Sequence, residues 1–165
     1  MDFPAILCNM KKKDVAVLAH LRQDGRMSLT SLSRKTGIPH STLFDKIRSK
    51  NLPVRRHTVL LDFEKLGFST RAYILLAVEK QQKQELIAHL TNVEQINCLF
   101  QINNGWDLML ECIFRDMRSL EAFVDQLEAK FPIKGKQVHY ILDEFKREGF
   151  LADPALAKLM IPEKI

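Results

Sequence analysis

The feature of this sequence that most constrains its fold is the alternation of apolar residues between Arg71 and Glu79. Every even position in this stretch is apolar, namely Ala72, Ile74, Leu76 and Val78. Successive side chains of a β-strand point to opposite faces, so a period of two predicts a strand with one buried face. The same pattern returns in residues 95–103, 106–115 and 136–145, which predicts further strands there.

Two amphipathic segments separate these strands. Gln82–Leu90 places Leu86 and Leu90 one helical turn apart, and Met117–Phe131 carries apolar residues at helical spacing along its length. Asn103-Asn104-Gly105 is a hairpin turn signal between the second and third strands. The resulting order, β-α-β-β-α-β, predicts an α+β fold of the ferredoxin-like type in which both helices cover one face of the sheet.

The second strand is expected to turn Ile96, Cys98, Phe100 and Ile102 towards the helices. The opposite face of the sheet has no further helix to cover it, apart from a possible short one around Pro154–Met160. Its apolar residues are Tyr73, Leu75, Ala77, Leu99, Met109, Ile113 and Ile141. An apolar patch of this size predicts a dimer in which two sheets pack face to face, with Tyr73, Leu75, Leu99, Met109, Ile113 and Ile141 at the interface. The alternative is a sheet that is simply apolar on both faces.

The first third of the chain predicts three short helices. The first spans Lys12–Gln23, Ser28 is a suitable N-cap for the second, and Gly37 ends it. The third follows Pro39 and turns Leu43 and Ile47 inward. A tight turn before the last of three helices is the plan of a helix-turn-helix domain.

The domain organisation follows from these patterns. We expect a (winged) helix-turn-helix domain at 1–54, an extended connector at 55–68 and a ferredoxin-like domain at 69–150. Residues 151–165 form a C-terminal extension with a possible short helix around Pro154–Met160.

The third helix is a candidate DNA-recognition helix. A step of about 100° per residue places Ser41, Asp45 and Arg48 at the centre of its outer face. Asp45 is predicted either to accept a hydrogen bond from cytosine or to pair with Arg48 or Ser49. Phe44 is predicted to touch a thymine methyl group or, alternatively, to pack on a neighbouring helix or the connector.

Charge is distributed unevenly along the chain. Residues 1–56 hold 12 Lys and Arg against 4 Asp, a net charge of +8, whereas the whole chain carries +5 and the remainder therefore −3. Such segregation predicts contact between the first third and a polyanion such as double-stranded DNA. The candidate DNA-binding residues are His40, Ser41, Thr42, Phe44, Asp45, Lys46, Arg48, Lys50, Arg34, Arg55 and Arg56.

Other classes of function find little support. The three cysteines, Cys8, Cys98 and Cys112, are odd in number and form no C-x-x-C pair, which favours reduced cysteines in a cytoplasmic protein. No apolar run approaches the roughly 18 residues of a membrane span, and no signal peptide is expected. No catalytic triad, phosphate loop or metal-binding spacing is present, so we predict no enzyme, no cofactor and no metal site.

Four short motifs resemble one known family when they are taken in order. Leu21-Arg22-Gln23-Asp24-Gly25-Arg26 resembles an "L-x-x-D-G-R" motif, and Ser41-Thr42-Leu43 resembles "S-T-V". Asp62-Phe63-Glu64-Lys65-Leu66-Gly67-Phe68 is similar to "D-P-x-K-L-G-[YF]", and Trp106-Asp107-Leu108 resembles "G-x-x-D-L". These are motifs of the Lrp/AsnC transcription factors. The resemblance implies a dimeric or larger DNA-binding assembly whose C-terminal RAM domain oligomerises and binds an amino acid or a related metabolite.

The chain departs from the family pattern in two places. The recognition helix stops early, before Pro53, and lacks the family's following glycine. In the hairpin, the family's glycine position falls on Asn104, a residue that tolerates positive φ. The predicted effector-binding residues are Asn103, Asn104, Gly105, Trp106 and Asp107. Asp107 is expected either to orient a ligand ammonium group or to cap the turn.

Two further functions remain open from the sequence. Siroheme decarboxylases share this two-domain fold, and Arg55-Arg56-His57 vaguely resembles the basic residues that such enzymes use on a tetrapyrrole. An architectural DNA-binding protein without an effector is the other alternative.

Overall fold

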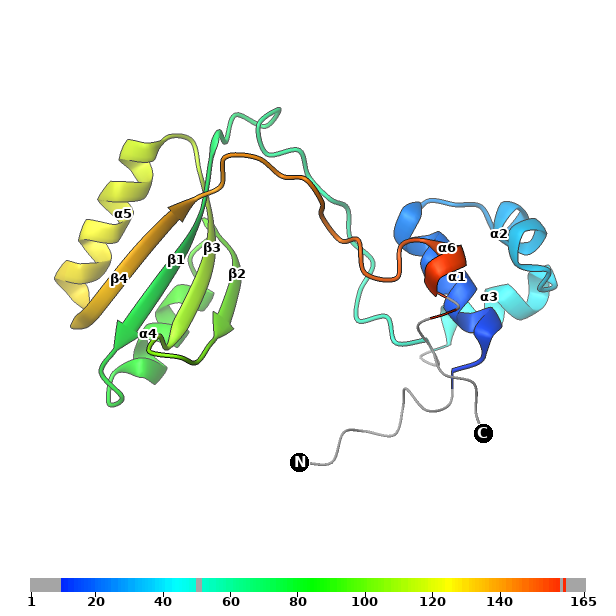
Figure 1. Cartoon of the computed structure of the whole chain (residues 1–165), viewed down its shortest axis with the longest axis horizontal. Coiled ribbons are helices and arrows are strands. Elements are labelled where there is room, and N and C mark those ends of the chain that lie inside the picture. Colours follow the sequence, from blue (N-terminus) through cyan, green and yellow to red (C-terminus); the bar gives the residue numbers. More distant parts are fainter. Residues whose placement is uncertain (1–9, 50–51, 158, 160–165) are drawn as a thin grey trace. The chain divides into compact units, whose positions relative to one another are not determined.

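The computed structural model describes residues 10–49, 52–157 and 159, and the chain divides into two compact units. One unit contains Met1–Leu60 together with Phe145–Ile165, and the other contains Leu61–Glu144 (Figure 1). The first is called the helical unit below and the second the sheet unit.

The sheet unit confirms the predicted order of elements. It contains β1 (Thr70–Val78), α4 (Lys83–Thr91), β2 (Ile96–Gln101), β3 (Leu108–Phe114), α5 (Met117–Lys130) and β4 (Ile133–Tyr140). The strands pair antiparallel in the order β2-β3-β1-β4. This is the ferredoxin-like arrangement that the sequence predicts.

The core of this unit lies between the sheet and its two helices. The even residues of β1 are almost completely buried and pack with Leu86 and Leu90 of α4 and with Leu120 and Val124 of α5. Each fully buried leucine stabilises the fold by about 1.5–3 kcal/mol relative to an exposed one. Burial alternates strictly along β1, so one face of the sheet belongs to this core and the other does not.

The predicted faces of β2 are wrong beyond its first residue. A register shift between Ile96 and Cys98 inserts an extra residue, after which Leu99 pairs with Leu110 of the core. Directly paired residues share a face, so Leu99 packs against the helix-covered core, whereas Cys98 and Phe100 lie on the open face. A period of two cannot reveal such a β-bulge, because one extra residue exchanges the two faces.

The last strand begins and ends earlier than predicted. β4 starts at Ile133, which pairs with Val78 beside a second register shift. It ends at Tyr140, and Leu142, which lies inside the predicted strand range 136–145, is 89% exposed.

The helical unit contains α1 (Lys12–Gln23), α2 (Leu29–Thr36), α3 (His40–Arg48) and α6 (Pro154–Ala157). The predicted caps of α2 are confirmed. The Ser28 hydroxyl oxygen accepts a hydrogen bond from the Ser31 N–H at 3.2 Å, and Gly37 takes the left-handed conformation with φ of 66°. Val17, Leu32 and Leu43, one from each of the first three helices, meet in a small core.

No strand is present among the described residues of the helical unit, so the expected wing is not seen there. Residues 53–60, which include the first part of the predicted extended connector, likewise have no regular secondary structure. Their side chains are exposed, so these residues have neither a neighbouring strand nor a hydrophobic core to pack against, which a strand would require.

The C-terminal segment completes the helical unit. Ala157 of α6 is 1% exposed and packs against Val15 and Ala19 of α1. Arg22 of α1 donates hydrogen bonds to the side chain of Glu148 at 2.7 Å and to its carbonyl oxygen at 3.0 Å. From the sequence, a helix in this segment is suggested only as a possible cover for the open face of the sheet.

We predict that Ala157→Asp lowers the free energy of unfolding of the helical unit by about 2–4 kcal/mol, because it buries a carboxylate against alanine and valine without a partner. Chemical denaturation followed by far-UV circular dichroism measures this effect. Ala155→Asp, at an exposed position of the same short helix, is the matched control. Equal loss of stability in both variants would contradict the packing of Ala157.

Candidate nucleic-acid interface and ligand site

The candidate recognition helix α3 is held by contacts with the turn that precedes it. The Ser33 hydroxyl donates to the Ile38 carbonyl oxygen at 2.6 Å, and the Gly37 N–H donates to the Ser33 carbonyl oxygen at 2.9 Å. Leu43 is fully buried and Ile47 half-buried in the core of the helical unit. The predicted inward pair is therefore confirmed, and it fixes which side of α3 faces solvent.

The outer side of α3 carries most of the predicted DNA-binding residues. His40, Ser41, Thr42, Asp45 and Arg48 are all exposed. Pro39, the N-cap, makes no side-chain capping bond to the helix. The N–H groups of the first turn are therefore free of such a cap, and this end of a helix attracts phosphate.

The side chains of Phe44 and Asp45 are exposed to solvent. The Phe44 ring is 47% exposed, and the Arg48 guanidinium carbon lies 5.9 Å from its centroid, a cation–π contact within the helix. Among the described residues, Asp45 forms no ion pair, and the Ser49 hydroxyl donates to the Lys46 carbonyl oxygen instead. The structure thus supports neither packing of Phe44 on another helix nor pairing of Asp45 with Arg48 or Ser49.

The predicted basic residues do not share one environment. Lys46 is half-buried, and its ammonium group pairs with Asp14 of α1 at 2.6 Å, so it joins two helices rather than facing solvent. Arg34, Arg55 and Arg56 are exposed, and Lys50 lies outside the described residues.

The hairpin between β2 and β3 forms as predicted. The Ile102 N–H donates to the Asp107 carbonyl oxygen at 3.0 Å, and Asn104 and Gly105 have φ of 64° and 89°. Positive φ at two successive positions is typical of the turns that favour Asn-Gly. Trp106 is half-buried and lies beside Gly135 of β4, where a Cβ would stand 3.7 Å from its ring.

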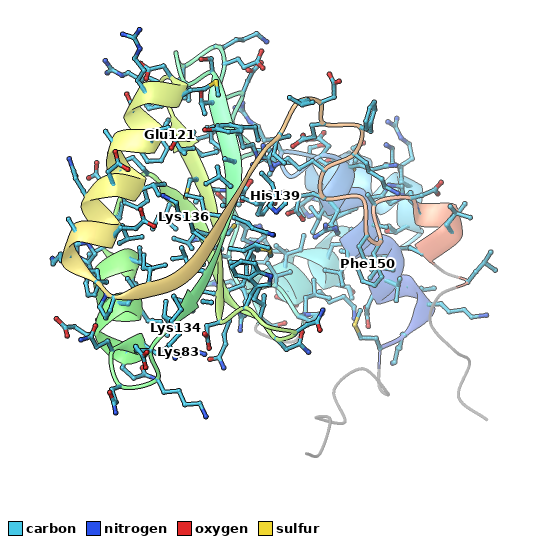
Figure 2. The ribbon with its side chains drawn as sticks, turned by 60° about the vertical axis from the view of Figure 1, so that its left-hand side comes forward. Lys83, Glu121, Lys134, Lys136, His139 and Phe150 are labelled. Carbon is cyan, nitrogen blue, oxygen red and sulfur yellow. The ribbon has the colours of Figure 1, made fainter. Side chains whose placement is uncertain are left out.

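The Asp107 carboxylate is bound within the chain. It accepts hydrogen bonds from the Val78 N–H at 3.0 Å and from the Lys83 ammonium group at 2.9 Å. The pKa of Asp107 lies below its ordinary value, first because of the Val78 N–H and then because of Lys83, with Lys134 adding to the effect. Figure 2 labels Lys83 and Lys134 at the same end of the sheet unit. This carboxylate therefore caps the end of β1, and Lys83 stands where a ligand ammonium group was expected.

The open face of the sheet is largely apolar, as predicted apart from β2. Register places Tyr73, Leu75, Met109 and Phe100 on this face, together with Ile113, which is 8% exposed. The Ile141 N–H donates to the Arg71 carbonyl oxygen at 2.9 Å, which extends the β1–β4 pairing to that residue.

A buried carboxylate lies among these apolar residues, and the sequence patterns did not single it out. Glu111 is 4% exposed and accepts hydrogen bonds from the Arg71 Nε at 2.7 Å and from the Asn97 side-chain amide at 2.7 Å. Arg71 also pairs with Glu144. Burial raises the pKa of Glu111, but hydrogen bonds from Cys98, Asn97 and Arg71 outweigh it and leave the pKa below its ordinary value.

The two described cysteines, Cys98 and Cys112, form no disulfide, and Cys8 lies outside the described residues. Burial raises the pKa of the Cys112 thiol to about 12, so it is an unreactive part of the core. No helix among the described residues is long and apolar enough to cross a membrane, and these residues contain no cluster suited to a metal ion.

We predict that Arg71→Met destabilises the sheet unit by about 2–3 kcal/mol, because it leaves the Glu111 carboxylate buried without its cation. The double variant Arg71→Met/Glu111→Met should regain most of this loss, since it removes the uncompensated charge. Urea denaturation of both variants tests the pair. Wild-type stability of the single variant would show that Glu111 does not need Arg71.

The Arg71–Glu111 pair also predicts that the stability of the sheet unit depends on pH. Because the pKa of Glu111 is lower in the folded state than its ordinary value of 4.5, its contribution to stability is complete above about pH 4.5. The contribution is lost as the pH falls through the folded-state pKa. The difference in unfolding free energy between the wild type and Glu111→Gln should therefore shrink below that pH, and a constant difference down to pH 3 would argue against an ionised Glu111.

The geometry of the two units defines a class of protein: a helix-turn-helix unit whose third helix has an exposed outer side, in one chain with a ferredoxin-like sheet unit. Comparison with known proteins agrees with this class. Residues 71–151 match the model of the Lrp/AsnC ligand binding domain. The HTH-type transcriptional regulator PYRAB01370 of Pyrococcus abyssi is 25% identical over 139 residues, which are 83% of this chain and 88% of that protein.

A second relative is the HTH-type transcriptional regulator FL11 of Pyrococcus abyssi, 24% identical over 81% of this chain and 89% of its own length. Solved structures share the fold. The transcriptional regulator NMB0573 of Neisseria meningitidis, in complex with L-Met, has a TM-score of 0.78 at 21% identity and covers 84% of this chain and 94% of its own. LrpC of Bacillus subtilis has a TM-score of 0.75 at 18% identity over 84% of this chain and 98% of its own.

Residues 71–151 thus resemble the Lrp/AsnC ligand binding domain, and the chain is similar over most of its length to HTH-type transcriptional regulators. The relatives named above are regulators rather than enzymes.

Proposed function

We propose that this protein is a cytoplasmic, sequence-specific DNA-binding regulator of transcription that acts as a homodimer or a larger homo-oligomer and responds to a small metabolite. The observation that carries the proposal is the exposed outer side of α3 on a strongly basic unit. Residues 1–56 carry a net charge of +8 by count, and basic side chains that neutralise phosphates supply sequence-independent affinity.

Specificity in this proposal comes from the middle of α3. Arg48 is the group suited to a bidentate contact with guanine, and Ser41 and Thr42 offer hydroxyl groups to phosphates or bases. Asp45 accepts a hydrogen bond from cytosine N4 and repels the DNA phosphate backbone. It therefore contributes to discrimination between base sequences rather than to overall affinity for DNA. Arg34, Arg55 and Arg56 add contacts with phosphates.

We predict that Arg48→Ala weakens binding to the operator at least about tenfold, the size expected for one base contact. Gel-shift titration with the chain's own promoter region and with unrelated DNA measures the change. Arg118→Ala, which removes the same charge from an exposed position of α5, is the control. Unchanged operator affinity of Arg48→Ala would remove this residue from the interface, and footprints without sequence preference would favour an architectural protein.

The proposed dimer packs two sheets through their open faces. Tyr73, Leu75, Met109 and Ile113 would form its apolar centre, with Ile141 at the β1–β4 side. Phe100, 45% exposed, takes the place on this face that was assigned to Leu99. Two-fold packing of identical faces buries this apolar area and satisfies the need to cover it.

We predict that Leu75→Glu converts the full-length dimer to a monomer, because two copies of the carboxylate would be buried at the two-fold contact. Sedimentation velocity measures the assembly state. Leu156→Glu, at a 59% exposed position of α6, should leave the assembly unchanged. A wild-type monomer at micromolar concentration would contradict the proposed dimer.

The effector proposal rests on the family and on the L-Met complex of the Neisseria regulator. The hairpin residues Asn103, Asn104, Gly105, Trp106 and Asp107 are its predicted site. In this chain the Asp107 carboxylate is already bound by Val78 and Lys83, so an amino-acid ligand there would have to compete with the lysine for it.

A further inference from the structure

Two stretches of the chain join the helical unit to the sheet unit (Figure 1). The first connection runs from Leu52, which is 8% exposed in the core of the helical unit, to Phe63 in the turn before β1. The second connection runs from Tyr140 at the end of β4 to α6, which packs on α1. Ala72 near the start of β1 pairs with Tyr140, so both connections leave the sheet unit at the same end.

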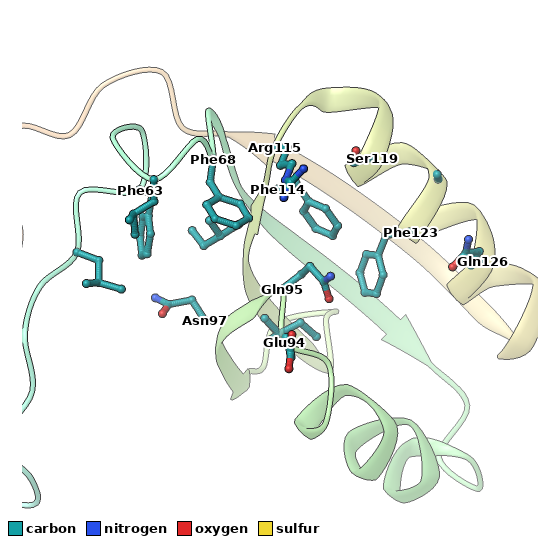
Figure 3. Close-up of a pocket in the computed structure, with 15 residues that line it drawn as sticks. Phe63, Phe68, Glu94, Gln95, Asn97, Phe114, Arg115, Ser119, Phe123 and Gln126 are labelled. Carbon is teal, nitrogen blue, oxygen red and sulfur yellow. The ribbon is translucent and has the colours of Figure 1, made fainter.

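The first connection is long. On the sheet side it reaches a turn in which the Phe68 N–H donates to the Phe63 carbonyl oxygen at 2.9 Å. Figure 3 shows both rings beside the cavity of about 810 Å³ that they help to line. Residues 53–60 are exposed and have no regular secondary structure. A fully extended chain rises at most about 3.6 Å per residue, so the Cα atoms of Leu52 and Phe63 can lie up to about 40 Å apart.

The second connection is short between its two fixed points. On the sheet side, Glu144 pairs with Arg71 of β1. On the helical side, Arg22 of α1 donates hydrogen bonds to the Glu148 carboxylate at 2.7 Å and to its carbonyl oxygen at 3.0 Å. By the same rise per residue, the Cα atoms of Glu144 and Glu148 can lie at most about 14 Å apart. The second connection, not the first, therefore limits the separation of the two units.

The sheet-side fixed point is part of the charge cluster on the open face. An exposed ion pair alone contributes little, because ordering two side chains offsets their attraction. Here Arg71 is already ordered by the buried Glu111, to which its Nε donates at 2.7 Å. The Ile141 N–H also donates to the Arg71 carbonyl oxygen at 2.9 Å. If the Glu144 pair opened, the fixed points would be Ile141 and Glu148, still at most about 25 Å apart.

The helical-side attachment is specifically folded. Glu148 and Leu151 have positive φ of 51° and 54°, a conformation that residues with a Cβ rarely adopt and that persists only where surrounding contacts impose it. Leu151 packs with Ala157 in the cluster formed on α1. The Asp153 carboxylate accepts a hydrogen bond from the Ala155 N–H at 2.8 Å, which caps α6. The end of the second connection is thus built onto the helical unit.

We propose that the second connection is a short tether that limits the reach of the helical unit and thereby fixes the half-site spacing that a dimer of this protein accepts. A dimeric helix-turn-helix protein binds two half-sites at once, and the spacing of its two recognition helices selects the spacing of the half-sites. The first connection alone would let each helical unit follow half-sites over a wide range of spacings. The consequence for DNA rests on the proposed function; the tether itself does not.

Two insertions test the tether without removing the contacts described above. A Gly-Ser linker of about 20 residues, whose ends lie on average about 25 Å apart, is placed between Phe145 and Lys146 in one variant and between Thr58 and Val59 in the other. The first variant lengthens the second connection and keeps both of its fixed points. The other variant lengthens the first connection, which is already long, and is the matched control.

Relaxation of the ¹⁵N amides of the full-length protein measures how each unit tumbles without DNA. In the wild type, the amides of α1–α3 and those of the four strands should give nearly equal correlation times. Insertion in the second connection should shorten the correlation time of α1–α3 relative to that of the strands, and insertion in the first should not. Wild-type melting temperatures establish that both variants fold.

Three results of this measurement would overturn the tether. They are independent tumbling of the two units in the wild type, no response to the insertion in the second connection, and an equal response to both insertions.

Gel-shift titration measures the consequence for DNA. The operator mapped by footprinting is compared with one whose half-sites are moved apart by one helical turn, about 10 bp, which keeps them on one side of the duplex. The wild type should bind the lengthened operator at least about tenfold more weakly, because only one helical unit can then bind a half-site. Insertion in the second connection should remove most of this loss, and insertion in the first should retain it.

Two substitutions extend the comparison to the attachment on α1. Ala157→Asp, which detaches α6, should act like the insertion in the second connection, whereas Ala155→Asp at an exposed position should act like the wild type. An unchanged loss on the lengthened operator with the insertion in the second connection would refute the role in spacing. Coupled tumbling in a protein that binds no DNA refutes only the regulator, and specific DNA binding by independently tumbling units refutes only the tether.

Discussion

The structure of the sheet unit depends on one constraint: an antiparallel sheet has two faces, and its two helices can cover only one of them. Leu86 and Leu90 of α4 and Leu120 and Val124 of α5 bury the even side of β1, and this hydrophobic contact holds the unit together. The uncovered face then has to be buried by another molecule or tolerated as apolar surface. The proposed dimer follows from this need.

The buried Glu111 gives the open face a second property. An ionic pair inside an apolar face contributes little net stability, because desolvation offsets the attraction, but breaking it is costly. Arg71 of β1 and Asn97 of β2 donate hydrogen bonds to the carboxylate, and Glu144, in the segment after β4, pairs with Arg71. Such a cluster favours the observed pairing of the strands, because in another register the buried Glu111 carboxylate would lose its partners.

In the helical unit, apolar residues orient α3, and its charged residues serve two different purposes. Leu43 and Ile47 orient α3, and Lys46 connects it to Asp14 of α1, so part of the basic charge is used inside the unit. The exposed residues of the outer side remain available for the proposed contact with DNA. In the sheet unit, the Asp107–Lys83 pair likewise closes the expected effector position.

The sequence by itself determined the order of elements, the capping of α2 by Ser28 and Gly37, the inward pair of α3 and the buried side of β1. Each depends on local periodicity or on the conformational preference of one residue. Both are properties of a short stretch of chain and can be read from neighbouring residues. Only the tertiary structure decided the exchange of faces in β2, the packing of Ala157 on α1, and the partners of Lys46 and Asp107. A bulge adds one residue that no period records, and the other contacts join residues far apart in the chain, whose proximity depends on how the whole unit packs.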